Sequence, residues 1–331
     1  MNLITKTEIP KGAVRFCHSD RMLLVGSCFS DSIGQKLESA KFNVAVNPFG
    51  TMYNPASIAE LLRRAMEGRR YDEDSDDMFM FEGRWHSWMH HSCLSASTKA
   101  ELVDNLNSVT DLVHDRLSDG DVLFVTFGTA ICYRMKSDGR VVANCHKQSE
   151  KLFERVRMGV ADIVDMWSAL IDDILHVNPK LRIVFTVSPI RHKRDGLHVN
   201  QLSKSTLLLA VDELCGRYPQ NCMYFPSYEI MIDELRDYRF YADDMVHPSS
   251  LAVDYIWERL SEACLSKDTL DLIKQFAGVS SALNHRPFNS ESDEYMGLMA
   301  RTLDKIKELK EKHPYVDMDA EMRICNTRLK R

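Results

Sequence analysis

The stretch RMLLVGSCFSD, residues 21–31, places a hydroxyl group between two predicted elements. The apolar run at 22–25 is short enough for a buried strand, and Ser30 or Asp31 can cap an amphipathic helix that extends to about residue 40. Ser27 therefore lies at a strand-to-helix corner, where backbone N–H groups can stabilise a developing anion. A plain turn with a helix cap explains the same residues equally well.

A second reactive group stands far along the chain, in YADDMVHPSS. Asp244 and His247 are three residues apart, just before Pro248, which is typical of a helix start. A serine hydroxyl becomes a good nucleophile when an imidazole accepts its proton and a carboxylate fixes the tautomer of that imidazole. One short loop thus carries both partners. Because Asp-x-x-His occurs often by chance, the pair indicates catalysis only in combination with the corner at Ser27.

Five short apolar runs alternate with helix-patterned sequence and predict the elements that position these residues. Parallel strands joined by helices indicate an α/β fold, a flavodoxin-like three-layer α/β/α arrangement with a central, mainly parallel sheet. In such sheets the functional residues lie beyond the carboxyl ends of the strands. Strands are predicted at 22–25, 43–46, 121–127, 181–187 and 222–225, and helices at about 55–67, 97–118, 159–176, 201–217 and 249–265.

Two regions depart from this alternation. Residues 81–97, FEGRWHSWMHHSCLSAS, carry two tryptophans and three histidines. Beyond about residue 266, a loop SALNHRPFNSES precedes an amphipathic helix near 292–311. We therefore expect an α/β hydrolase-like domain at 1–265 and a C-terminal helical extension at 266–331, which packs on the main domain or on a partner. The apolar stripe of that helix contains Tyr295, Met299, Thr302, Ile306 and Leu309.

Composition excludes several classes of protein. A net charge of −6 and a pI near 6.1 lack the basic field of nucleic-acid-binding proteins. No apolar run approaches about 18 residues, and MNLITKTEIPKG lacks the apolar core of a signal peptide, so we expect neither membrane insertion nor secretion. Nine scattered cysteines without CxxC pairs fit reduced thiols in the cytoplasm. The oligomeric state stays open.

The early Gly-x-Ser-type block and the late Asp-x-x-His block resemble those of the SGNH hydrolases. More closely, the chain resembles the GSCFA family, whose motif stands here as residues 26–30, GSCFS, with serine in place of the final alanine. The resemblance covers roughly residues 15 to 260 and implies the SGNH-type three-layer fold. Further matching stretches are NPFGTMYNP at 47–55, FGTAICYR at 127–134, VVANCHK at 141–147, TVSPIRHKRDG at 186–196 and FPSYEIMIDELRDYRFYADDMVHPS at 225–249.

The resemblance implies a catalytic group and an activity. Ser27 is the expected nucleophile, His247 its general base and Asp244 the orienting carboxylate. The expected activity is that of a serine esterase without metal or cofactor, which cleaves a small O-acyl ester, such as an acetyl ester on a carbohydrate, through an acyl-enzyme. An acyltransferase using the same triad and a non-catalytic binding or scaffold protein that keeps the fold are the alternatives.

The oxyanion hole is where the chain departs from the SGNH pattern. The glycine N–H of the second block is best matched by Gly50, but the third-block asparagine is absent, since 128–130 read Gly-Thr-Ala. Loss of one oxyanion donor can reduce turnover roughly 10²–10³-fold, so a substitute donor or a slow enzyme is expected. Thr129 at this block and Asn144 farther along the chain are the candidate replacements, with His146 beside Asn144.

The residues at 81–97 allow two interpretations. His86, His90, His91 and Cys93 could suggest zinc, but the segment offers no Glu in an HExxH pattern. We favour an aromatic flap near the mouth of the site, in which Trp85 and Trp88 stack on a flat ligand or pack in the core. The candidate substrate-binding residues are Trp85, His86, His146 and His192.

Two further groups invite a reactive interpretation. Cys28 is a rival nucleophile, although a residue directly after the serine of a tight corner is expected to point elsewhere, which favours a small packed side chain. The basic run at 191–194, Arg-His-Lys-Arg, is interpreted as a solvated loop, with recognition of an anionic substrate group as the alternative.

Overall fold

A parallel five-stranded sheet forms the centre of the molecule in the computed structural model, which describes residues 5–10 and 14–330. The strand order is β10-β9-β5-β1-β2, and each neighbouring pair is parallel. The sequence pattern predicted these strands to within two residues at each end. They are β1 (Arg21–Gly26), β2 (Asn43–Val46), β5 (Val122–Phe127), β9 (Arg182–Val187) and β10 (Cys222–Tyr224).

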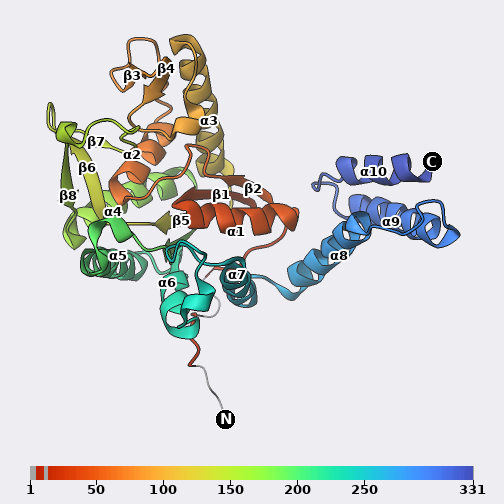
Figure 1. The fold of residues 1–331 in the computed structure, drawn as a ribbon. Coiled ribbons are helices and arrows are strands. Elements are labelled where there is room, and N and C mark those ends of the chain that lie inside the picture. Colours follow the sequence, from red (N-terminus) through yellow and green to blue (C-terminus); the bar gives the residue numbers. More distant parts are fainter. Residues whose placement is uncertain (1–4, 11–13, 331) are drawn as a thin grey trace.

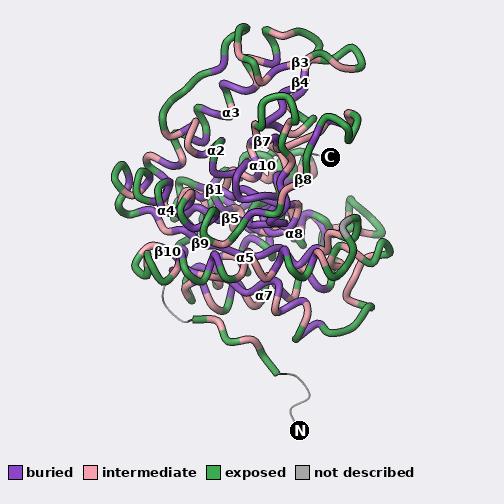
Figure 2. The backbone as a smooth tube through the Cα atoms, turned by 90° about the vertical axis from the view of Figure 1, so that its left-hand side faces the viewer, coloured by how far each residue is buried: buried purple, intermediate pink, exposed green. Residues whose placement is uncertain are grey.

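Helices cover both faces of this sheet, which confirms the three-layer α/β/α fold (Figure 1). Successive residues of a strand point to opposite faces. Leu23 and Val25 accordingly pack with α2, α3, α4 and α5, whereas Met22 and Leu24 pack with α1 and α7. Figure 2 shows the buried backbone concentrated around β1, β5 and β9. The helices are α1 (Cys28–Ser39), α2 (Pro55–Met66), α3 (Lys99–Asp119), α4 (Val160–Val177), α5 (Leu197–Arg217), α6 (Ser227–Glu229) and α7 (Ser250–Cys264).

Two small antiparallel sheets stand beside the central one and were missed by the sequence pattern. The hairpin of β3 (Met78–Phe81) and β4 (Arg84–Ser87) begins a segment, residues 78–97, that we call the flap. The second sheet contains β6 (Ile131–Met135), β7 (Val141–Val142) and β8 (Phe153–Arg157). The two are joined through Trp88, which stacks on Phe79 at 3.6 Å between centroids and packs against Phe153.

The C-terminal extension is a cluster of three helices with a core of its own: α8 (Lys267–Asn284), α9 (Asp293–Lys312) and α10 (Asp319–Leu329). All five residues of the apolar stripe predicted for 292–311 are buried, as expected. The predicted start of the following loop, near residue 281, was wrong, because α8 continues to Asn284. His18 packs on Phe276 at 5.1 Å, and Lys41 pairs with Glu321 at 2.5 Å, so the cluster contacts the main domain.

None of the helices in the described ranges is both long and apolar enough to cross a lipid bilayer.

Candidate active site

The corner after β1 depends on a glycine. Gly26 has φ of +138°, and a Cβ atom at this position would lie 2.2 Å from the carbonyl oxygen of Thr126 on the neighbouring strand. The Gly26 N–H donates to Oδ1 of Asn47 at 2.9 Å, which ties the corner to the end of β2. Because the colliding atom belongs to the backbone, only glycine lets the chain turn this closely against β5.

Ser27 is the N-cap of α1 rather than a group exposed to a cavity. Its side chain is buried, and Oγ accepts from the N–H of Phe29 at 3.3 Å. Its own N–H donates to the Thr126 carbonyl at 3.1 Å. Within the described ranges, the Ser27 hydroxyl forms no hydrogen bond with His247.

Cys28 occupies the position facing the imidazole that the sequence analysis assigned to Ser27. Its Sγ lies 3.5 Å from Nε2 of His247 and lines a pocket. The first residues of a helix also present backbone N–H groups without acceptors inside the helix. The signal was available in the sequence: a Gly-x-nucleophile block that starts at Gly26 places its third residue at 28.

His247 is held by Asp244 as the sequence suggested. Nδ1 of His247 lies 2.5 Å from Oδ2 of Asp244, while Oδ1 accepts from the N–H groups of His247 and Val246, each at 2.9 Å. These hydrogen bonds, led by the one from the His247 backbone, lower the pKa of Asp244 to about 2. The carboxylate therefore stays charged near neutral pH and directs Nε2 toward Cys28.

The thiol at rest is neutral. Burial, with a smaller contribution from the nearby Asp31 carboxylate, raises the pKa of Cys28, and Lys204 opposes that shift. An adjacent imidazole, here that of His247, can accept the proton of such a thiol.

The pocket at Cys28 has a volume of about 320 Å³ and collects residues that follow several strands of the central sheet. Such a location agrees with the general position of sites in open α/β sheets. Its lining also includes cationic side chains from the loop after β9 and from β8. The lining residues are Cys28, Tyr53, Asn54, Thr129, Ile131, Tyr133, Ala143, Arg155, Ile190, Arg191, His192, Arg194, Val246 and His247.

Of the three residues expected to form an oxyanion hole, the structure brings only Thr129 to the pocket. The Gly50 N–H is used in a turn, donating to Asn47 O at 2.7 Å, and Asn144 accepts from the His146 N–H at 2.8 Å. Neither of those two lines the pocket.

Asn54, which sequence reasoning missed, does line the pocket. As the N-cap of α2 it accepts from the Ser57 N–H at 2.9 Å, and its Nδ2 donates to Ser57 Oγ at 3.0 Å. A side-chain amide has two N–H donors, so one donor remains for a ligand. A cap position directly before Pro55 was the sequence signal for its location.

Of the candidate substrate-binding residues, only His192 lines the pocket. His86 is buried in the flap, bonded to Ser95 Oγ at 2.6 Å, and Trp85 lies under the Lys99 ammonium at 5.1 Å. His146 bonds to Ser87 O at 2.7 Å, and burial lowers its pKa to about 4.

The suggested zinc ligands are engaged in the flap instead. Nδ1 of His90 lies 2.9 Å from Ser87 Oγ, and burial lowers the pKa of His90 to about 3. Nδ1 of His91 accepts from the Cys93 N–H at 3.3 Å. Among the described residues, no group of three or more His, Cys, Asp or Glu side chains is arranged to hold a metal ion.

Lys204 of α5 is a second residue that sequence reasoning missed. It is fully buried, and its Nζ donates to the Gly128 carbonyl at 2.7 Å and to the Ser188 carbonyl at 2.6 Å. It thereby joins the ends of β5 and β9, the two strands whose following loops form the pocket. Burial lowers the pKa of Lys204 to about 7.

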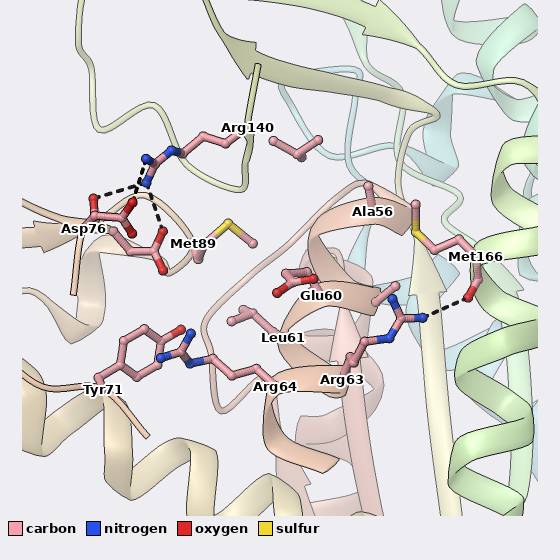
Figure 3. A pocket seen from close by; sticks show the side chains of 13 residues that line it. Ala56, Glu60, Leu61, Arg63, Arg64, Tyr71, Asp76, Met89, Arg140 and Met166 are labelled. Carbon is pink, nitrogen blue, oxygen red and sulfur yellow. Dashed lines mark hydrogen bonds and ion pairs between the residues drawn. The ribbon is translucent and has the colours of Figure 1, made fainter. Parts of the chain in front are cut away.

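A larger cavity of about 420 Å³ lies between α2, the flap and β7 (Figure 3). Its charges are largely paired: Arg140 bonds to Asp76 at 2.8 Å, and Glu60 bonds to Arg69 at 3.2 Å. No serine or cysteine stands among its lining residues as described. The pocket at Cys28 is the candidate active site because it contains the contact between Cys28 and the Asp244-bonded His247.

A family model covers the part of the chain that contains both the corner and the late loop. The model of the GSCFA family matches residues 21–260, which include both. The model of the GSCFA domain protein, C-terminal domain, matches residues 276–331, which include most of α8 and all of α9 and α10. No curated protein matches the chain. With the family model covering well over half of its length, the chain belongs to the GSCFA family.

Proposed function

We propose that the chain is an acyl-transfer enzyme with a cysteine nucleophile, and that its simplest reaction is hydrolysis of a small ester. One observation carries the proposal: the continuous line from the Asp244 carboxylate, through both nitrogens of His247, to the sulfur of Cys28. Cysteine with histidine and an orienting third group is an established variant of the serine triad. The assignment replaces Ser27 by Cys28 and keeps His247 and Asp244 in their expected roles.

The reaction proceeds in two balanced steps. Cys28 Sγ attacks the ester carbonyl carbon while its proton passes to Nε2 of His247, and the tetrahedral oxyanion faces the Cys28 N–H and the amide of Asn54. Collapse breaks the C–O bond, and His247 protonates the leaving alkoxide. Water then attacks the thioester with His247 as base, which releases the carboxylic acid and restores the thiol.

The acceptor in the second step distinguishes two versions of this proposal. Water gives an esterase, for which an O-acyl carbohydrate is the substrate class implied by the likeness to SGNH enzymes. An alcohol or amine in place of water gives an acyltransferase with the same residues. The half-exposed His247, with 47% of its side chain accessible, leaves room for either acceptor.

Alkylation and turnover test the nucleophile. Iodoacetamide forms an S–C bond with a thiol and releases iodide, so mass spectrometry identifies the reacting cysteine. We expect Cys28 to react although it is neutral at rest, because His247 can accept its proton as the S–C bond forms, and we expect Cys28→Ala to abolish hydrolysis of 4-nitrophenyl acetate. Ser27→Ala should retain turnover, with loss of about 1 kcal/mol of stability from the helix cap.

Three results would decide against the assignment. Loss of activity in Ser27→Ala with the fold preserved, together with fluorophosphonate labelling of Ser27, would restore the serine esterase. Unchanged turnover in Cys28→Ala would remove the thiol from the mechanism. Absence of both alkylation at Cys28 and turnover in well-folded protein would favour a binding or scaffold protein.

A further inference from the structure

Resting on the proposed function, we propose that this pocket recognises substrates that carry an anionic group, a carboxylate or a phosphate, and that Arg191 binds that group. The sequence analysis favoured a solvated loop for residues 191–194. The structure instead places part of this run in the pocket wall beside the catalytic loop.

The charges of the pocket wall have one sign. Arg155, Arg191 and Arg194 line the pocket, whereas no aspartate or glutamate is among the lining residues that the structure describes. The whole chain has a net charge of −6, so this local excess of cations runs against the general character of the protein. A cleft lined by one sign of charge concentrates ligands of the opposite sign.

The three arginines differ in their partners. Arg194 forms an ion pair with Glu150 at the surface, and Arg155 lies over the Tyr133 ring at 5.6 Å. Arg191 has no carboxylate partner in the described part of the chain, and its Nε and Nη2 are buried without a hydrogen-bond acceptor. Buried donors of a charged group are costly when unpaired. Because these two atoms have almost no accessible surface, an anion in the pocket would satisfy them only if the side chain turns toward it.

Arg191 is also held in place before any ligand binds. Its guanidinium lies 3.9 Å from the centroid of Tyr241 and 5.3 Å from that of Tyr238. Its backbone N–H donates to the Val246 carbonyl at 3.3 Å, one residue before His247. The guanidinium packs on two adjacent rings, which line a second pocket together with Arg191. Its planar donors are suited to a carboxylate or a phosphate. This hydrogen bond connects Arg191, the proposed anion-binding residue, to the loop that carries His247.

The pocket volume limits the size of this substrate. About 320 Å³ is at the lower end of the range for small-molecule sites, which suits a short acyl or alcohol portion that ends in one anionic group. The anionic group can belong to the acyl portion or to the leaving group of the ester. Pairs of esters that differ by one charge in either portion distinguish these two cases.

The first experiment measures binding through protection of Cys28. The rate of its reaction with iodoacetamide is followed by mass spectrometry in phosphate or sulfate, with sodium chloride holding the ionic strength constant. We expect either anion to slow the reaction, and we expect Arg191→Gln to weaken this protection about tenfold. Arg301→Gln on exposed α9 removes the same charge outside the pocket and should leave protection unchanged.

The second experiment compares esters that differ by one charge. Mono-4-nitrophenyl glutarate against 4-nitrophenyl butyrate tests an anionic acyl group, and 4-acetoxybenzoate against phenyl acetate tests an anionic leaving group. We expect one pair to show a preference for the anion in kcat/KM, and we expect Arg191→Gln to reduce that ratio about tenfold. Arg191→Lys keeps the charge and should restore part of the ratio.

The outcomes separate this inference from the proposed function. Alkylation of Cys28 that neither phosphate nor sulfate slows, with ester ratios equal in parent and Arg191→Gln, would overturn the anion site and leave the nucleophile standing. An equal loss for charged and neutral esters in Arg191→Gln would make Arg191 a brace of the His247 loop and would also overturn it. Failure of Cys28 to react at all in folded protein would instead refute the proposed function.

Discussion

Histidines stand in two contrasting settings in this molecule. His247 is half-exposed, bonded to a charged carboxylate on one side and facing a thiol on the other. The flap cluster, which we define as His86 and His90 of the flap together with His146 packed against it, is buried and bonded to serine hydroxyls and backbone carbonyls. Both groups were candidates for chemistry in the sequence.

The difference lies in what surrounds each ring. A carboxylate and solvent access let an imidazole take up and release a proton, which a general base requires. Burial lowers the pKa of His146 to about 4 and that of His90 to about 3, which keeps these two rings uncharged near neutral pH. The surroundings of the flap cluster are those of packed side chains, whereas the surroundings of His247 are those that the proposed mechanism requires.

The largest expected effect comes from His247→Gln. If Cys28 depends on this base, ester turnover should fall by roughly 10³-fold or more, with the unfolding temperature little changed. The matched variant His146→Gln should do the reverse, lowering the unfolding temperature while the folded fraction keeps its turnover. Comparable kcat values in the two variants, after correction for the folded fraction, would show that His247 is no more important for turnover than His146.

Asp244→Asn sharpens the account of His247. The neutral amide cannot stabilise the imidazolium and favours the wrong tautomer, so turnover should fall by roughly 10²-fold, less than in His247→Gln. Turnover equal to that of the parent would show that the Asp244 carboxylate acts on the loop backbone alone.

Lys204→Met tests the buried ammonium below the pocket. We expect a fall in turnover of about tenfold, since the loops after β5 and β9 lose a shared donor. The pKa of about 7 lies below the ordinary value of 10.5, so between these two values the unfolded chain binds the proton more readily. Stability from this group should therefore rise from pH 7 to 10.5 in the parent and not in Lys204→Met. A constant difference in unfolding temperature across that window would contradict the lowered pKa.

The smallest expected effect is a local loss of stability of the flap in acid. Unfolded histidine titrates near 6.5, above the pKa of the folded His146 and His90, so the open flap takes up protons that the closed flap excludes. Stability is complete above about pH 6.5 and declines toward pH 4. Hydrogen exchange should show residues 84–91 losing protection in this range while β5 keeps it. Equal loss in both segments would point to global unfolding instead.

Most of the fold could be predicted because buried parallel strands are short apolar runs. The five central strands and their covering helices follow directly from that pattern. The strands of the flap and of β6–β8 could not, since they are short, partly exposed and interrupted by polar residues. Helix α8 was missed although Leu272, Phe276, Val279 and Leu283 recur at helical spacing and are buried.

The site was predictable where its residues are neighbours in sequence. Asp244 and His247 share one loop, and their pairing followed from spacing. The choice between Ser27 and Cys28 depends on the direction of two successive side chains, which the φ of Gly26 and the cap of α1 determine. Lys204 sits in a helix whose sequence gives no sign that this lysine is buried.

The residues at 26–28 divide three tasks among three neighbours: Gly26 turns the chain, Ser27 begins the helix and Cys28 meets the imidazole. Replacement of the Cys28 sulfur by oxygen would therefore leave the turn at Gly26 and the helix cap at Ser27 unchanged. A single-base codon change could convert such a thiol enzyme into an alcohol-based one on an intact scaffold. Evolution from a thiol nucleophile to an alcohol nucleophile, or the reverse, would leave the strand-to-helix corner unchanged.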